Sequence, residues 1–87
     1  MKFRDIHFFK TDRFTLGIEE ESGNYYISIP VSNHIVDYEE YYQISAEEFN
    51  QFQINHDDAK ELADRCRKRL EDERLLQTPG TMRGSSV

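Results

Sequence analysis

The amino-acid sequence predicts an α+β fold, in which a four-stranded antiparallel meander is followed by a short and a long C-terminal helix packed on one sheet face. Up to about residue 44, apolar and polar residues alternate in short runs, as in half-buried strands. From residue 46 onward, apolar residues recur three and four positions apart, as on one face of a helix. We expect a single domain at residues 1–76, because 87 residues form one small core, and a flexible tail at 77–87.

The first two predicted strands cover residues 2–9 and 14–20. The apolar residues of the first strand do not alternate cleanly with polar ones, so the sequence does not determine which face of this strand is buried. In the second strand, Phe14, Leu16 and Ile18 share one face, because side chains two residues apart on a strand point the same way. Residues 10–13 form the predicted turn between them.

A hairpin turn at residues 21–24 leads into the third predicted strand, residues 25–29. Its signal is Gly23 followed by Asn24, two residues that accept a positive φ at low cost. Pro30 has no N–H to donate to a neighbouring strand, so it ends this strand or marks a sheet edge. The fourth predicted strand covers about residues 36–44.

The predicted helices begin with the clearest local signal in the chain. Ser45 as N-cap and Glu48 three residues later form a capping box, which predicts a short helix at residues 46–53. Asn55 is the predicted cap of a second helix, which runs from about residue 57 to Leu76. Its apolar stripe consists of Ala59, Leu62, Ala63, Cys66 and Leu70. The following Pro79-Gly80 pair stops the helix.

Charge is unevenly distributed along the chain. No lysine or arginine lies between Phe14 and Ala59. We call residues 14–59 the acidic block, because they hold most of the carboxylates that set the net charge of −6, together with all five tyrosines. Its carboxylates are Glu19, Glu20, Glu21, Asp37, Glu39, Glu40, Glu47, Glu48, Asp57 and Asp58. Such a surface repels nucleic acid and attracts a basic protein. We therefore expect a basic protein as the partner and no nucleic acid.

Rings and carboxylates alternate along the third and fourth predicted strands and form the candidate partner-binding site. Glu39 and Tyr41 project together, and we expect Tyr26 on the same side of the sheet. Tyrosine is enriched among the residues that dominate binding energy in interfaces. The candidate residues are Tyr26, Asp37, Glu39, Glu40, Tyr41, Glu19, Glu20 and Glu21. The alternative is that the tyrosines only pack on the sheet and the acids only keep the surface soluble.

No catalytic, metal-binding or cofactor-binding motif stands out, so we expect neither an enzyme nor a cofactor. The three histidines are scattered, without the i, i+4 spacing of a helical metal site. The one cysteine, Cys66, lies on the apolar stripe and cannot form an internal disulfide. No apolar run approaches the roughly 20 residues of a membrane helix, and no signal peptide is visible. We expect a cytoplasmic protein that does not bind membranes.

The short acidic chain resembles a small bacterial immunity protein of the kind that guards against contact-dependent growth inhibition and related polymorphic toxins. The resemblance is one of type: the segments at residues 25–31 and 37–42, rich in tyrosine and acid, precede a terminal helix. It implies a non-enzymatic inhibitor in the cytoplasm that binds one cognate, basic, nuclease-like toxin domain. These proteins share no diagnostic motif, so the resemblance assigns no role to any single residue.

Two other functions are compatible with the same sequence. The chain could be a self-associating structural protein, a homodimer that pairs through an exposed strand edge or through the second predicted helix. It could also be a small ligand-binding domain or enzyme with a pocket of tyrosine and glutamate side chains. A dimer that survives high salt would favour the first, and small-molecule binding that depends on Tyr41 would favour the second.

Overall fold

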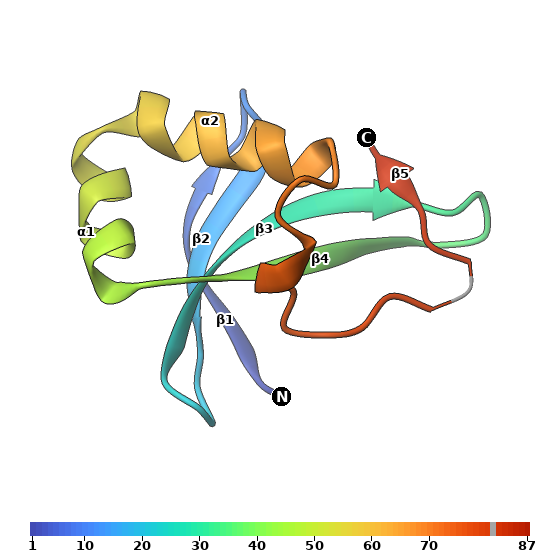
Figure 1. Cartoon of the computed structure of the whole chain (residues 1–87), viewed down its shortest axis with the longest axis horizontal. Helices are drawn as coiled ribbons and strands as arrows, with labels where there is room; N and C mark the ends of the chain where they lie inside the picture. The colour runs from blue at the N-terminus through green and yellow to red at the C-terminus, as the bar shows by residue number, and fades with distance from the viewer. Residues whose placement is uncertain (81) are drawn as a thin grey trace.

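The computed structural model describes residues 1–80 and 82–87. The sheet consists of β1 (Phe3–Phe9), β2 (Phe14–Glu19), β3 (Asn24–Ser32) and β4 (Asp37–Ile44). Each strand pairs antiparallel with the next one in the chain, in the order β1-β2-β3-β4 (Figure 1). The predicted four-stranded meander is therefore confirmed.

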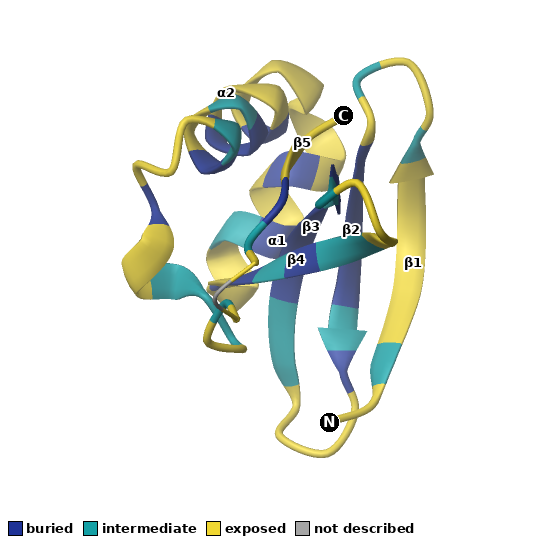
Figure 2. Cartoon of the chain, turned by 90° about the vertical axis from the view of Figure 1, so that its right-hand side faces the viewer, coloured by how far each residue is buried: buried dark blue, intermediate teal, exposed yellow. Residues whose placement is uncertain are grey.

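Two helices, α1 (Ala46–Ile54) and α2 (His56–Arg67), follow the sheet and lie on the same side of it (Figure 2). The predicted capping box is present: the Ser45 hydroxyl accepts from the Glu48 N–H at 3.0 Å, and Glu48 Oε1 accepts from the Ser45 N–H at 2.8 Å. The Asn55 side chain caps α2 by accepting from the N–H of Asp58 at 3.4 Å. These caps satisfy N–H groups that have no partner within the helices.

The two faces of the sheet differ in what covers them. A row of fully buried side chains, Leu16, Ile27 and Tyr42, belongs to the core face, where they form one cluster with residues of both helices. The next row, Gly17, Tyr26 and Gln43, belongs to the other face, which no helix of the described chain covers. We call this the open face. The register and alternation place on it Phe3, Asp5, Phe8, Thr15, Gly17, Glu19, Asn24, Tyr26, Ser28, Pro30, Ser32, Asp37, Glu39, Tyr41 and Gln43.

A β-bulge in β1 explains why the first strand does not alternate in sequence. Asp5 pairs with Gly17 and His7 pairs with the adjacent Leu16, so Ile6 is an extra residue in β1. Beyond the bulge the alternation inverts. His7 therefore lies on the helix side, where its Nε2 is 3.0 Å from Gln53 Oε1 of α1.

The second helix is shorter than predicted, because α2 ends at Arg67 instead of running to Leu76. A Schellman motif ends it: the Leu70 N–H donates to the Arg65 carbonyl and the Arg69 N–H to the Cys66 carbonyl, both at 3.0 Å. Arg69 adopts a φ of 60°, a conformation usually taken by glycine. Leu70 therefore leaves the predicted apolar stripe and is 52% exposed. A short 3-10 helix, η1 (Asp72–Arg74), follows.

β3 continues through Pro30 to Ser32, beyond its predicted end. Pro30 pairs with Glu39 of β4, and both residues direct their main-chain groups away from each other, because the Pro30 carbonyl and, two residues after Glu39, the Tyr41 carbonyl bond outward. The missing N–H of Pro30 would face the other side of β3. The pairing with β2 does not reach this position, since its last pair is Thr15 with Ser28. There the Pro30 carbonyl accepts from the N–H of Val87 at 3.2 Å, so proline fits inside this strand.

The last residues of the chain, predicted as a flexible tail, make specific contacts with the sheet. β5 (Ser85–Ser86) pairs antiparallel with β3, opposite Ser32 and Val31 (Figure 1). The Gly84 N–H donates to the Tyr38 hydroxyl at 2.7 Å. A Cβ at Gly84 would lie 2.5 Å from the carbonyl carbon and oxygen of Ser32, so only glycine fits this close approach.

Candidate protein-binding face

Three aromatic side chains form one cluster on the open face. The rings of Phe3 in β1 and Tyr41 in β4 stack with their centroids 3.6 Å apart and 7° between their planes. Tyr26 of β3 lies perpendicular to both, 5.5 Å from Phe3 and 4.9 Å from Tyr41. Because β1 and β4 are the two ends of the strand order, the cluster shows that the sheet curves around the open face.

Tyr26 is the buried member of this cluster and contacts both other rings. The side chain is fully buried, and its hydroxyl donates to Asp5 Oδ1 at 2.6 Å. Burial, together with this hydrogen bond, raises the pKa of Tyr26 far above the ordinary tyrosine value. Gly17 lies opposite Tyr26, and any side chain there would collide with the Tyr26 hydroxyl. The sequence correctly places Tyr26 on the side of Tyr41, but its burial leaves it no surface for a partner.

Tyr41 of the cluster and the nearby Glu39 remain partly accessible. The Ser28 hydroxyl donates to Glu39 Oε1 at 3.1 Å. Burial raises the pKa of Glu39, and the negative charge of Asp5 raises it further. The pKa of Tyr41 is raised by burial first and then by the charges of Asp5 and Glu39. The carboxylates of Asp5 and Glu39 therefore both lie near the ring of Tyr41. A cation placed there would stabilise the ionised form of both carboxylates.

The three neighbouring acids, Glu19, Glu20 and Glu21, organise the turn between β2 and β3. Glu19 is only 2% exposed and accepts from the N–H groups of Lys2, Glu21 and Ser22 at 2.7–3.0 Å. Hydrogen bonds from Ser22, Lys2 and Glu21 lower the pKa of Glu19 from 4.5 to about 2. Glu20 lies 3.7 Å from the Arg4 guanidinium, and Glu21 lies 3.0 Å from the terminal amine. Glu19 is thus part of the fold, whereas Glu20 and Glu21 are exposed.

Glu40, another predicted site residue, is buried on the core face. It accepts from the Tyr42 hydroxyl at 2.8 Å and from Arg83 Nε at 2.7 Å. Arg83 also contacts Asp72, and hydrogen bonds to Asp72 and Glu40 raise the pKa of the Arg83 guanidinium. Glu40 therefore anchors the C-terminal segment instead of facing a partner. Asp37, at the start of β4, is exposed.

The acidic block of the sequence is partly neutralised in the fold by basic residues from both ends of the chain. Arg83 pairs with Glu40, and Arg74 pairs with Glu48 at 3.0 Å. Within residues 1–80 and 82–87, no lysine or arginine lies within ion-pair distance of Asp5, Asp37 or Glu39. These three acids, which flank the aromatic cluster and the start of β4, carry the negative charge that remains available there.

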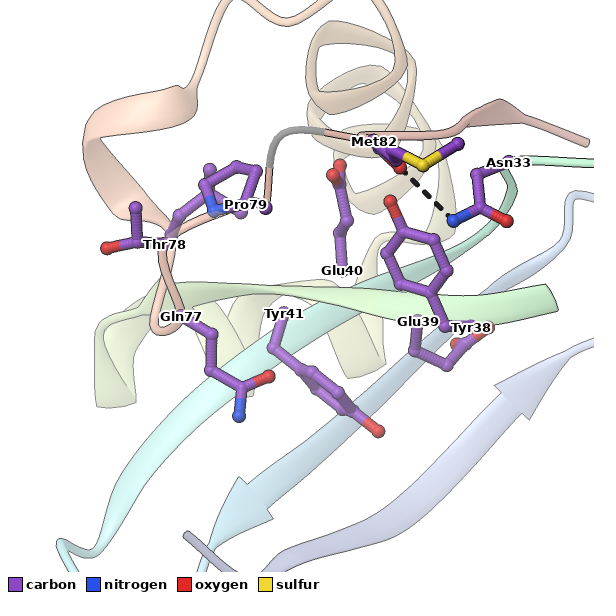
Figure 3. A pocket seen from close by; sticks show the side chains of 11 residues that line it. Asn33, Tyr38, Glu39, Glu40, Tyr41, Gln77, Thr78, Pro79 and Met82 are labelled. Atoms are coloured by element: carbon purple, nitrogen blue, oxygen red, sulfur yellow. Dashed lines mark hydrogen bonds between the residues drawn. The ribbon is translucent and has the colours of Figure 1, made fainter. Parts of the chain in front are cut away.

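A cavity of about 380 Å³ lies between β4 and the chain segment that follows η1 (Figure 3). On the β4 side it is bounded by Tyr38, Glu39, Glu40 and Tyr41. Opposite them are Leu75, Gln77, Thr78, Pro79, Gly80 and Met82, and Asn33 closes one end. We call this cavity the edge pocket, because Tyr38 and Glu40 extend from one side of β4 and Tyr41 from the other. It joins the accessible side of Glu39 and Tyr41 to the outer edge of the sheet.

A second cavity, of about 360 Å³, lies on the open face at the other end of Glu39. It is lined by Phe8, Lys10, Arg13, Thr15, Pro30 and Glu39. Phe8 is 67% exposed, although it is a large apolar residue. The charge of Arg13 partly offsets the raised pKa of Glu39. The open face is thus acidic around Tyr41 and mixed in charge near the turn between β1 and β2.

Other kinds of chemistry have little support among the described residues. No group of three or more His, Cys, Asp and Glu side chains in residues 1–80 and 82–87 is arranged to hold a metal ion. Cys66 is buried, and desolvation raises the pKa of its thiol to about 12, which disfavours the reactive thiolate. No helix in the described part of the chain has the length and apolar character needed to cross a membrane.

Comparisons with models of protein families, with curated proteins and with solved structures found no match to this chain. The function is therefore inferred from the geometry of the open face and the edge pocket.

Proposed function

We propose that this protein is a non-enzymatic binding protein that captures a basic protein through its open face. The observation that carries the proposal is the aromatic cluster of Phe3, Tyr26 and Tyr41, which no helix of the described chain covers and which lies beside Asp5 and Glu39. Aromatic side chains bury much area at low entropic cost, and the carboxylates speed encounter with a partner of opposite charge.

The contacts that hold the aromatic cluster in place favour a preformed binding surface. Tyr26 is held by Asp5 and by the space that Gly17 leaves, and it in turn contacts the rings of Phe3 and Tyr41. A surface whose side chains are already fixed loses less conformational entropy on binding. The direct contacts we propose are therefore Tyr41, Glu39, Asp37 and Asp5, with Phe3 and Phe8 as apolar neighbours.

The partner that fits this chemistry is a protein domain with a positively charged surface. Nuclease-like toxins have basic clefts because their substrates are polyanions. We therefore propose that the protein acts as an immunity protein, which neutralises such a toxin domain by covering its basic surface. This proposal extends the resemblance of the sequence to small bacterial immunity proteins and rests on the charge and aromatic content of the open face.

A comparative pull-down from cells that make the protein tests this function. The baits are the wild type, an open-face variant (Asp5→Asn, Glu39→Gln, Tyr41→Ala) and a helix-side control (Asp57→Asn, Glu61→Gln), whose two substituted acids are exposed on α2. Proteins bound at low salt are eluted with a salt gradient and identified by mass spectrometry. We expect one basic protein on the wild type and on the control, and its loss from the open-face variant. Equal capture by all three baits, or an acidic partner, would contradict the proposal.

Self-association is the second candidate function, and the exposed Phe8 and Ile6 of the outer strand β1 favour it. The bulge at Ile6 opposes it, because bulges disturb the regular pairing that two strand edges need. Sedimentation of the purified protein measures its oligomeric state and so distinguishes self-association from capture of a different protein. A dimer that persists at high salt and is lost in Phe8→Ser would favour self-association.

A further inference from the structure

The outer edge of β4 offers main-chain groups for hydrogen bonding. The Leu76 N–H donates to the Tyr41 carbonyl at 2.9 Å, next to a bridge between Leu75 and Tyr42. Main-chain groups alternate in direction along a strand, so Glu39, two residues before Tyr41, also directs its N–H and carbonyl away from β3. Within residues 1–80 and 82–87, no hydrogen bond reaches these two groups of Glu39. The edge of the sheet is therefore open at Glu39, beside the edge pocket.

We infer that the edge pocket receives an extended, basic segment of the partner protein, which adds to β4 as a further strand at Glu39. This inference rests on the proposed function, since it describes how the basic partner is held. The cavity volume of about 380 Å³ lies in the range of ligand-binding sites. In strand addition, main-chain hydrogen bonds provide affinity, and alternate side chains provide specificity. Leu75, Pro79 and Met82 supply the apolar wall that such a segment would contact.

The charges at this edge favour a basic strand over a second copy of the protein. Two β4 strands paired antiparallel would bring Asp37 and Glu39 of one copy close to the same acids of the other, which is destabilising. A partner residue directly opposite Glu39 projects to the same face as Glu39 and Tyr41. Lysine or arginine at that position would meet both the carboxylate and the aromatic ring.

A pair of methylated peptides tests strand addition. The probe is acetyl-Thr-Lys-Val-Arg-Val-Lys-Thr-amide, titrated into ¹⁵N-labelled protein while the amide signals are followed by NMR. We expect the amide of Glu39 and its neighbours on β4 to shift. When the peptide pairs antiparallel to β4 and its basic side chains share the face of Glu39, the N–H groups of these basic residues point at β4. N-methylation of the three basic residues should therefore weaken binding at least about tenfold, whereas N-methylation of the two valines leaves affinity unchanged.

Two substitutions at one position provide the matching test on the protein. Glu39→Gln and Glu39→Pro both remove the carboxylate, but only proline removes the outward N–H. The β3–β4 ladder keeps its hydrogen bonds in both variants, since that N–H does not point at β3. We expect Glu39→Pro to bind the probe several-fold more weakly than Glu39→Gln, with both variants retaining the dispersed NMR spectrum of the folded protein.

Different outcomes separate this inference from the function on which it rests. If both methylated peptides bind alike and the two Glu39 variants bind alike, but all binding weakens with salt, strand addition is wrong and an acidic binding surface remains. If the probe shifts only amides of α1 and α2, both strand addition and the proposed use of the open face are wrong.

Discussion

Glu19 shows how a single carboxylate organises one end of the open face. It collects three N–H groups, from Lys2, Glu21 and Ser22, and so fixes both the turn between β2 and β3 and the beginning of the chain. Phe3, which follows Lys2, pairs with Glu19 and stacks on Tyr41. The position of the aromatic cluster thus depends on an acid that does not itself face a partner.

The lowered pKa of Glu19 predicts a specific dependence of stability on pH. Because the folded-state pKa of about 2 lies below the ordinary 4.5, ionised Glu19 stabilises the fold above about pH 4.5. This contribution is lost as the pH falls from 4.5 towards 2. In Glu19→Gln, the free energy of unfolding measured in urea should fall below that of the wild type at pH 7, and this difference should shrink by pH 2.5. The exposed control Glu61→Gln should show no such change, and a difference in Glu19→Gln that is constant with pH would contradict the assignment.

In β3 and β4, side-chain faces could be predicted from the sequence, but side-chain roles could not. Alternation places Tyr26 with Tyr41 and Glu40 with Tyr42, as the register shows. It does not reveal that Arg83, 43 residues away, closes on Glu40 and removes it from the binding surface. The opposing Gly17 is the one signal that could have indicated the burial of Tyr26, because glycine in a strand often marks a close approach.

At the scale of elements, local signals in the sequence predicted where helices begin better than where they end. The capping box at Ser45 and the cap at Asn55 depend on residues close in the chain, and both are present. The end of α2 depends on a positive φ at Arg69. Glycine or asparagine usually takes this conformation at a helix end, so an arginine there gives no signal in the sequence. β5 depends on pairing with Val31 and Ser32, far away in the chain, so its two residues carried no signal of their own.

The C-terminal segment predicts a clear contrast between two glycines. Gly84→Ala would place a Cβ 2.5 Å from Ser32, whereas a Cβ at Gly80 meets no atom within 4 Å. We expect Gly84→Ala to lower the free energy of unfolding by about 1–3 kcal/mol, and Gly80→Ala to leave it nearly unchanged. Amide hydrogen exchange reports the local effect, because the N–H groups of Gly84 and Val87 bond to Tyr38 and Pro30. If these amides exchange equally in both variants, the segment is not held as described.

At the scale of the whole molecule, the distribution of charge differs between sequence and fold. The chain carries a net charge of −6, yet Arg74, Arg83 and the terminal amine return to the acidic block and pair with it. What remains on the open face is a small group of acids: Asp5 and Glu39 beside Tyr41, and Asp37 at the start of β4. Local charge at that face, more than net charge, is what we expect to guide a basic partner.

The association rate of the protein with its captured basic partner tests this central claim most directly. Glu39→Lys and Glu61→Lys change the net charge equally, but the first lies on the open face and the second on the outer surface of α2. Stopped-flow measurements at low salt should show association slowed roughly tenfold in Glu39→Lys. Association of Glu61→Lys should stay near the wild-type rate, and the contrast should fade as salt increases. Equal rates for the two variants at low salt would contradict capture through the open face.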